Sequence, residues 1–182
     1  DAASTGTITI GGGGGSDYTV DKTTIAASEL NTLDSQYGTV DASAVTTITG
    51  TAADINTVYT AGSAGTITGL GNESVTLTDT TVSATSLNTL DANTTGVVNA
   101  AAVTTLTGTV AELNTFYASS GISGLGNEAV TITDTTIDAA LLITLDAFTS
   151  GLINASSITT LTGSDAVSYT HLRAHETPLN RV

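Results

Sequence analysis

The chain has no cysteine, methionine or tryptophan, a single proline, and only three basic residues among its 182. Without cysteine it can form neither disulfides nor a thiolate metal site. No apolar run approaches the roughly eighteen residues that a bilayer-spanning helix needs, so we expect no membrane span. The seventeen acidic residues give a net charge of −14, and such a surface repels nucleic acid and anionic membranes. Neither is therefore expected among the partners.

The two ends differ in character from the rest of the chain. It begins at Asp1 rather than Met and shows no secretion signal, so we expect the native N-terminus to be missing. The string VSYTHLRAHET at 167–177 resembles a translated sequencing-library adaptor. Both histidines, the only proline and two of the three basic residues fall in the last twelve positions: His171, Arg173, His175, Pro178 and Arg181. We assign 165–182 to a non-native tail.

His171 and His175 have the spacing of a helical metal-ligand pair, with Glu176 beside them. Two ligands without a third make a poor site, and both lie in the assigned tail. We predict no metal site there.

Internal repetition dominates the remainder. One version of the repeat, here type A, starts at Tyr18, Val75 and Val130 with YTVDKTTIAASELNTLD, VTLTDTTVSATSLNTLD and VTITDTTIDAALLITLD. A second version, type B, alternates with it and starts with VTTITGTAADINTVY, VTTLTGTVAELNTFY and ITTLTGS at Val45, Val103 and Ile158. Each A–B pair forms a long repeat. Successive starts are about 27–30 residues apart, a length typical of solenoid units.

Within each unit the apolar period changes from two to about 3.6, which indicates a strand followed by a helix. The alternation in 75–78 predicts a strand, and Thr51 with Asp54, like Thr109 with Glu112, predicts a capped helix start. The helices should be short, roughly eight to ten residues. A second short strand or corner is expected at Val40, Val98 and Ile153, with Leu70 and Leu125 in that place in type B. Glycines at the returns should supply positive φ: Gly38, Gly69, Gly96, Gly124 and Gly151.

These patterns predict a repeat solenoid of about six 27–30-residue β-α units, in which a parallel sheet is backed by short helices. The alternative is a β-solenoid whose LNT segments are turns. Residues 1–16, which include the run Gly11–Gly15, are predicted to be a linker or truncated unit, and 17–164 the repeat array.

The recurrent aspartates are the first candidates for a functional site. They are Asp79 and Asp134 after the strand, and Asp34, Asp91 and Asp146 after L-N-T-L or its variant. Stacked in register they could hold calcium, which prefers several oxygen ligands. The alternative is that they end helices and turns, where Asp is common. No D-x-D-x-D-G loop is present, so calcium is named only as a candidate cofactor, and we assign no catalytic, cofactor-binding or metal residue.

Asparagine and threonine also recur at fixed positions. Asn31, Asn56, Asn88 and Asn114 are expected to form a buried ladder that satisfies backbone groups, with Ile143 replacing the fifth. An outward T-x-T array is expected at Thr76, Thr78, Thr131 and Thr133, the kind of surface that ice-binding solenoids use. The type B string V-T-T-I-T should interrupt its alternation. Sequons at Asn72, Asn93 and Asn154 are attributed to chance in an Asn- and Thr-rich chain.

The strings TTLTGT, AELNTFYASSGISGLGNEAVT and LNTLDANTTG resemble tandem arrays of very large bacterial cell-surface and adhesin-like proteins, notably those of marine cyanobacteria. The resemblance covers about 18–163. It implies an exported, elongated structural protein, extracellular or at the cell surface, whose partners are neighbouring repeats and cell-surface polymers, with no catalytic residues to carry over. The repeats lack His and Cys, and we predict no enzyme activity. The alternatives are a repeat surface that binds carbohydrate, mineral, calcium or ice, and a phage fibre segment.

Overall fold

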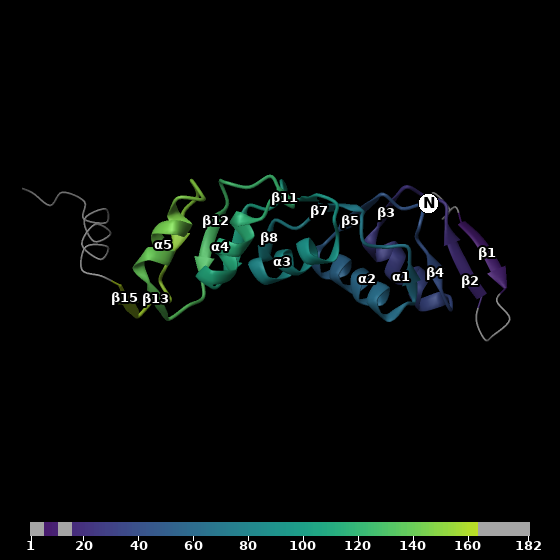
Figure 1. The fold of residues 1–182 in the computed structure, drawn as a ribbon, viewed down its shortest axis with the longest axis horizontal. Coiled ribbons are helices and arrows are strands. Elements are labelled where there is room, and N and C mark those ends of the chain that lie inside the picture. Colours follow the sequence, from purple (N-terminus) through teal and green to yellow (C-terminus); the bar gives the residue numbers. More distant parts are fainter. Residues whose placement is uncertain (1–5, 11–15, 164–182) are drawn as a thin grey trace, which may run out of the picture.

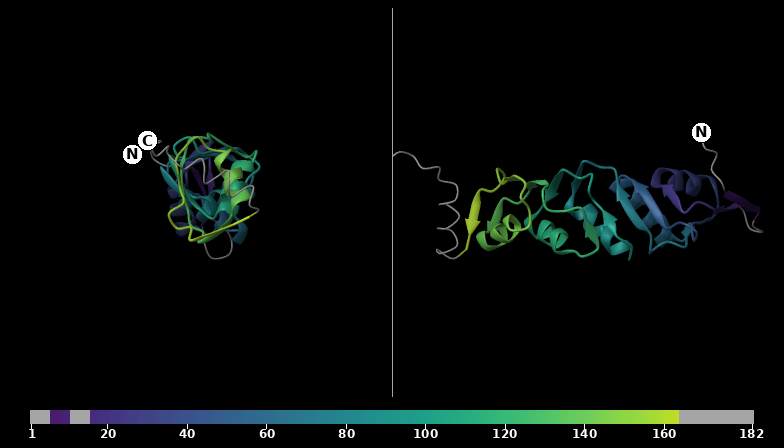
Figure 2. Two further views of the ribbon diagram at one scale, coloured as in Figure 1. Left: turned by 90° about the vertical axis from the view of Figure 1, so that its left-hand side faces the viewer. Right: turned by 90° about the horizontal axis from the view of Figure 1, so that it is seen from above.

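The computed structural model describes residues 6–10 and 16–163, which form an elongated α/β rod with β1 at one end and β15 at the other (Figure 1). Its five helices follow one another along the rod (Figures 1 and 2). They are α1 (Ala27–Gln36), α2 (Ala52–Ala64), α3 (Ala84–Asn93), α4 (Val110–Ala118) and α5 (Ala139–Asp146). Each packs against the next, from α1 to α5.

The strands form four sheets. One has the order β1-β2-β4-β6, the second β11-β9-β7-β5-β3, the third β14-β12-β10-β8, and the last β13-β15. Their bounds are β1 (Gly6–Ile10), β2 (Ser16–Val20), β3 (Thr24–Ala26), β4 (Val40–Asp41), β5 (Thr47–Gly50), β6 (Ile67–Thr68), β7 (Ser74–Leu77), β8 (Thr81–Ser83), β9 (Val98–Asn99), β10 (Thr105–Gly108), β11 (Ile122–Ser123), β12 (Ala129–Ile132), β13 (Thr136–Asp138), β14 (Ile153–Asn154) and β15 (Thr160–Thr162).

Parallel pairing joins every neighbouring pair of strands except β1 and β2, which are antiparallel. In the parallel pairs, Tyr18 of β2 lies beside Val40 of β4, and Ile48 of β5 beside Val75 of β7. Parallel strands need a long crossover, and here each crossover contains a helix, a further strand or both. The chain therefore returns to each sheet after one strand-and-helix circuit.

The sheets are staggered along the rod. New sheets begin at β3, β8 and β13, each immediately before a type A helix. Earlier sheets end at β6 and β11, each just after a type B helix. The starting strands begin at Thr24, Thr81 and Thr136, and so recur once in each long repeat. Each later type A unit supplies three strands and each complete type B unit two, so five strands accompany every two helices.

The sequence predicted part of this arrangement. Strand–helix alternation is confirmed, and β4, β9 and β14 form at the expected Val40, Val98 and Ile153. The LNT segments lie in helices, so the alternative in which they are turns is wrong. The expectation of a single sheet with one main strand per unit is also wrong, because β3, β8 and β13 are additional strands.

The type B return strands lie earlier in the chain than predicted. β6 and β11 contain Ile67 and Ile122, whereas Leu70 and Leu125 lie in the following loops. The reason is the left-handed turn that follows each strand, with φ of 81° at Gly69 and 84° at Gly124. Both leucines still pack against the core from these loops.

Local capping forms as the sequence indicates. The Thr51 side chain accepts a hydrogen bond from the Asp54 N–H at 3.1 Å. Thr109 and Glu112 form a complete capping box, in which Glu112 also accepts the Thr109 N–H at 2.9 Å. These contacts satisfy N–H groups that the first helical turn leaves unpaired.

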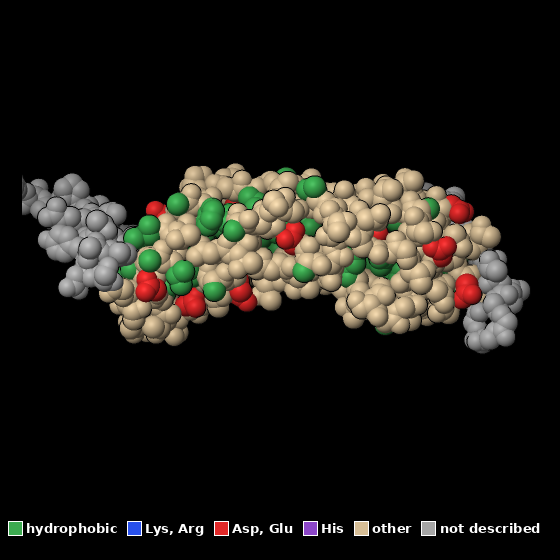
Figure 3. Space-filling model, in the orientation of Figure 1, with side chains coloured by type: hydrophobic (Ala, Val, Ile, Leu, Met, Phe, Trp, Pro, Cys, Tyr) green, Lys and Arg blue, Asp and Glu red, His purple; other side chains and the backbone are tan. Residues whose placement is uncertain are grey.

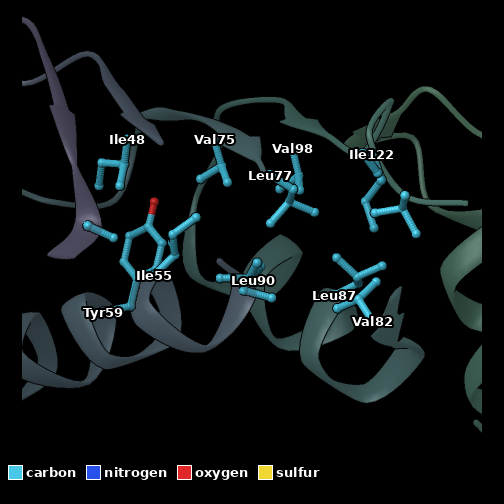
Figure 4. Packing of buried hydrophobic residues seen from close by; sticks show 14 of the residues in the cluster. Ile48, Ile55, Tyr59, Val75, Leu77, Val82, Leu87, Leu90, Val98 and Ile122 are labelled. Carbon is cyan, nitrogen blue, oxygen red and sulfur yellow. The ribbon is translucent and has the colours of Figure 1, made fainter. Parts of the chain in front are cut away.

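One hydrophobic core runs through the described units (Figure 4). Ile48 and Val75 from the strands face Ile55 of α2, and all three are fully buried. Leu87 and Leu90 of α3 continue the core into the next unit. Burying such a side chain stabilises the fold by roughly 1.5–3 kcal/mol, but one unit offers only a few of them. The units therefore depend on their neighbours for a core. Among the described residues, no helix has the length and apolarity to cross a membrane.

Candidate functional site

The recurrent aspartates after the type A strand bind the start of the preceding type B helix. Asp79 Oδ2 accepts the Ala52 N–H at 2.7 Å, and Asp134 Oδ2 accepts the Val110 N–H at 2.7 Å. Ala52 and Val110 are the first residues of α2 and α4. A carboxylate at this point pairs a free N–H and interacts favourably with the helix dipole. These aspartates are therefore caps supplied by the following unit.

The other recurrent aspartates do not share one role. Asp91 Oδ2 accepts the Ser119 hydroxyl at 2.7 Å. Asp34 is half-buried, and its Oδ1 has no partner among the described residues, whereas Asp146 is exposed. Within the described ranges no group of three or more acidic or histidine side chains is placed to hold a metal ion. The structure thus gathers no calcium site from the five candidates.

The asparagine ladder is confirmed, and it lies along the row of helices. Asn31 Nδ2 donates to the Asp54 carbonyl at 3.0 Å, and Asn88 Nδ2 donates to the Glu112 carbonyl at 3.0 Å. Asn56 and Asn114 make the same contact to Ser86 and Leu141, at 3.3 and 3.2 Å. Each acceptor is the third residue of the next helix. The side chains are half-buried rather than buried, and Ile143, which replaces the fifth, is exposed.

Sequence reasoning missed two fully buried carboxyl groups. Glu73 and Glu128, the last residues of the two LGNE strings, have no exposed surface. Tyr59 of α2 donates its hydroxyl to Glu73 Oε2 at 3.2 Å, and the Gly71 N–H donates to the same oxygen at 2.9 Å. The signal was present as an identical LGNE before two strands and a tyrosine in each type B helix.

The second cluster repeats the first. Tyr117 donates to Glu128 Oε2 at 3.0 Å, as does the Gly126 N–H. A buried carboxylate needs such hydrogen bonds because it has lost its hydration. Each cluster joins a type B helix to the type A strand that follows it.

A threonine after α3 and another after α5 complete the two clusters. Thr94 donates to the Glu73 carbonyl at 2.7 Å and Thr149 to the Glu128 carbonyl at 3.0 Å. At Gly96 a Cβ atom would collide with the Glu73 carbonyl, and at Gly151 with that of Glu128. Close backbone approach therefore requires glycine at these two positions. The predicted positive φ is wrong for Gly38, Gly96 and Gly151, though correct for Gly69 and Gly124.

The clusters keep their tyrosines protonated. Burial raises the pKa of Tyr59, the hydrogen bond with Thr94 lowers it in part, and the Glu73 carboxylate raises it further. The pKa of Tyr117 is raised for the same reasons, with Thr149 and Glu128 as the neighbours. At neutral pH both hydroxyls therefore act as hydrogen-bond donors rather than as bases.

Glu112 is a capping carboxylate whose pKa is lowered by hydrogen bonds. The Thr85 hydroxyl, 2.7 Å from Oε1, is the largest cause of a lowered pKa for Glu112, and hydrogen bonds from Thr109 add to it. Thr85 lies in α3 and Glu112 in α4. The capping carboxylate thus also joins two consecutive helices.

Hydroxyl side chains occupy unburied positions on β5, β7, β10 and β12. Thr76 lies beside Thr49 of β5, and Thr131 beside Thr107 of β10. The expected interruption in type B falls at the start of the strand, because Val45 and Ile48 are both buried and two threonines lie between them. Within β5, 47–49 keeps the alternation, and Thr46 before the strand donates to the Thr23 carbonyl. The strands of the sheet from β3 to β11 contain no charged residue. Acidic side chains appear as separate patches in Figure 3.

A shallow hollow of about 370 Å³ lies beside the first cluster, lined by residues that include Tyr59, Ser63, Gly71 and Asn93. Its lining residues include no charged side chain and no nucleophile–base pair. The sequon asparagines Asn72, Asn93 and Asn154 are exposed. The histidine pair of the tail lies outside the described residues, as do Gly11–Gly15.

Comparisons with protein-family models, with curated proteins and with solved structures find no match to this chain. The recurrent residues must therefore be interpreted from their own contacts.

Proposed function

We propose that this chain is a structural repeat segment, an α/β solenoid of about six units that acts as a scaffold or spacer in an exported cell-surface or adhesin-like protein. The observation that carries the proposal is the direction of its recurrent polar contacts. Asp79 caps the helix of the preceding unit, and Asn88 donates a hydrogen bond to the helix of the following unit. Glu73 accepts a hydrogen bond from Tyr59 and so joins its strand to the preceding helix. The repeated polar residues serve to join units.

An elongated shape supports a spacer role. The units succeed one another along one axis (Figure 1), so the number of units sets the length. Catalysis forms no part of the proposal, since the acids recur in successive units and are committed to structural hydrogen bonds. Placement at the cell surface rests on the sequence resemblance and on an acidic, cysteine-free composition.

A second candidate function is favoured by the outer sheet surface. Columns of Thr and Ser without charge, such as Thr49 with Thr76, would suit a neutral, ordered partner such as carbohydrate or ice. Replacing both threonines by aspartate should abolish binding to a glycan array or inhibition of ice recrystallisation if this surface binds either. The spacer proposal requires neither activity.

Duplication of the long repeat tests the spacer proposal. A second copy of 75–129 inserted before Val130 restores the register, because Val130 occupies the position of Val75. Helices pack about 8–10 Å apart, so two more helices should lengthen the particle by roughly 16–20 Å in small-angle scattering. A single cooperative unfolding transition should be retained. An unchanged maximum dimension, or an inserted segment that unfolds separately, would contradict the proposal.

A further inference from the structure

The junctions between successive units are of two kinds. From each of the first two type A units to the type B unit that follows, strands pair in two different sheets. β3 pairs with β5 and β4 with β6, and in the next long repeat β8 pairs with β10 and β9 with β11. From type B to type A, a single pair of the described strands crosses, which is β5 with β7 and later β10 with β12. One kind of junction is thus joined by two sheets and the other by one.

This difference follows from where the sheets end. β6 and β11 are the last strands of their sheets, so these two sheets stop within a type B unit. The single ladder of a type B to type A junction has four residue pairs, against three and two in the paired ladders of the other kind. Helices pack across both kinds of junction, and an asparagine donates across both. The type B to type A junction therefore has the smaller main-chain connection.

Buried carboxylates reinforce this smaller connection. Tyr59 of α2 donates to Glu73, just before β7, and the Ala52 N–H donates to Asp79, just after it. The second junction repeats these contacts through Tyr117, Glu128, Val110 and Asp134. Both glutamates have no exposed surface, so water replaces their hydrogen bonds only when the junction opens. Each cluster therefore holds closed a junction that a single ladder spans.

The hydrogen bonds between units run along the rod. Units succeed one another along its axis, and strands of neighbouring units pair side by side (Figure 1). A pull on the two ends of the rod therefore acts along the direction of these bonds, since paired strands are stacked in the direction of their hydrogen bonds. Bonds loaded in this way break one after another rather than together. The rod should accordingly open at its junctions in sequence.

We propose that the rod lengthens under tension by opening at its type B to type A junctions, so that each long repeat is released as one step. The two-sheet junction keeps the type A and type B units of a long repeat together until then. Two units detached from their neighbours have too little core to stay folded, so the released chain extends. This response to load rests on the proposed spacer function. A released repeat should refold when tension falls, because its contacts join residues close in the sequence.

The length of each step follows from the sequence. Long repeats start at Tyr18, Val75 and Val130, so a released repeat frees 57 or 55 residues. With about 3.3–3.6 Å per extended residue, less roughly 16–20 Å for the folded repeat, each step should add roughly 160–190 Å. Release of single units would give steps of about half that length. The step length thus distinguishes opening at one kind of junction from opening at both.

Single-molecule force spectroscopy of the full chain, held at its two ends beside an immunoglobulin-like marker domain, measures these steps. We expect steps of one long repeat, at lower force than the marker, whose terminal strands are loaded in shear. Glu73→Ala should lower the force of one step, and Glu128→Ala the force of another. Ser16→Ala, at the equivalent place of the first unit, should change neither. Circular dichroism checks that each variant is folded before it is pulled.

The cysteine-free chain also allows the opening junction to be located with a disulfide. Thr49 and Thr76 lie side by side on β5 and β7, across a type B to type A junction. Neighbouring strands lie about 4.7–4.9 Å apart, which a disulfide can bridge. Thr49→Cys/Thr76→Cys should remove the low-force opening of this junction when oxidised and restore it when reduced. Thr24→Cys/Thr47→Cys, which locks a type A to type B junction, should leave that opening force unchanged.

Three results would overturn the proposal. One is a step length of a single unit, or a rod that unfolds in one event. Another is an opening force that neither Glu73→Ala nor Glu128→Ala lowers. The third is a low-force opening that persists in oxidised Thr49→Cys/Thr76→Cys. Each leaves the spacer proposal standing, because the spacer proposal concerns the length of the rod without load.

Discussion

The first type A unit and the two later ones differ at the positions whose polar side chains contact the preceding type B helix. The later units have Glu73 and Asp79, or their equivalents, and both contact the preceding type B helix. The first unit has Ser16 and Lys22 in these places, and no helix precedes it among the described residues. The backward-facing carboxylates thus occur in the two type A units that follow a described type B helix.

The largest effect expected from this comparison is at Glu73. Glu73→Ala leaves the Tyr59 hydroxyl and the Gly71 N–H buried without an acceptor, which should lower the free energy of unfolding by about 3 kcal/mol. Urea denaturation measures it. Ser16→Ala in the first unit should change stability by less than about 0.5 kcal/mol. Equal losses at the two positions would contradict the comparison.

Alkaline pH should act on the same clusters. The folded-state pKa values of Tyr59 and Tyr117 are raised above the ordinary value of 10.0, so their contribution to stability is complete below that pH. Above that pH the stability should fall by about 1 kcal/mol per tyrosine per pH unit, because only in the unfolded chain do the tyrosines ionise readily. Denaturation from pH 9 to 11 measures this slope. Tyr59→Phe/Tyr117→Phe should remove it; a retained slope would assign it to other groups.

A smaller loss is expected at the capping aspartates. Asp79→Ala frees the Ala52 N–H of α2 and should cost about 1 kcal/mol, seen as a lower midpoint of thermal unfolding. Asp134→Ala should match it. Lys22→Ala at the same position of the first unit removes only a partly exposed ion pair, worth about 0.5 kcal/mol or less. A larger effect at Lys22 than at Asp79 would reverse the interpretation.

The smallest effect should be at the asparagine ladder, where first and later units are alike. Asn31→Ala and Asn88→Ala each remove one hydrogen bond to the next helix and should cost about 0.5–1 kcal/mol. The two losses should agree, because a helix follows each residue. A much larger loss at one position, measured by urea denaturation, would show that its contact is not equivalent to the other.

Local signals in the sequence were sufficient for part of the fold. The helix caps at Thr51 and Thr109 and the strand-to-helix change of period depend on residues a few positions apart. The strand β8 could not be predicted, because so short a segment becomes a strand only by pairing with β10, which lies beyond α3 in the chain. Burial of Glu73 likewise depends on Tyr59 of α2 and on Thr94, which follows α3.

The staggering of the sheets has a mechanical consequence. Packed helices lie about 8–10 Å apart and paired strands about 4.7–4.9 Å apart. A sheet that adds one strand for each helix therefore bends into an arc, with its helices on the long outer side. Here no sheet continues past all the described helices, because a new sheet begins once in each long repeat. The bend is thus confined to short stretches, in keeping with the nearly straight axis in Figure 1. Each duplication of a long repeat would then extend the reach of the protein without turning its direction.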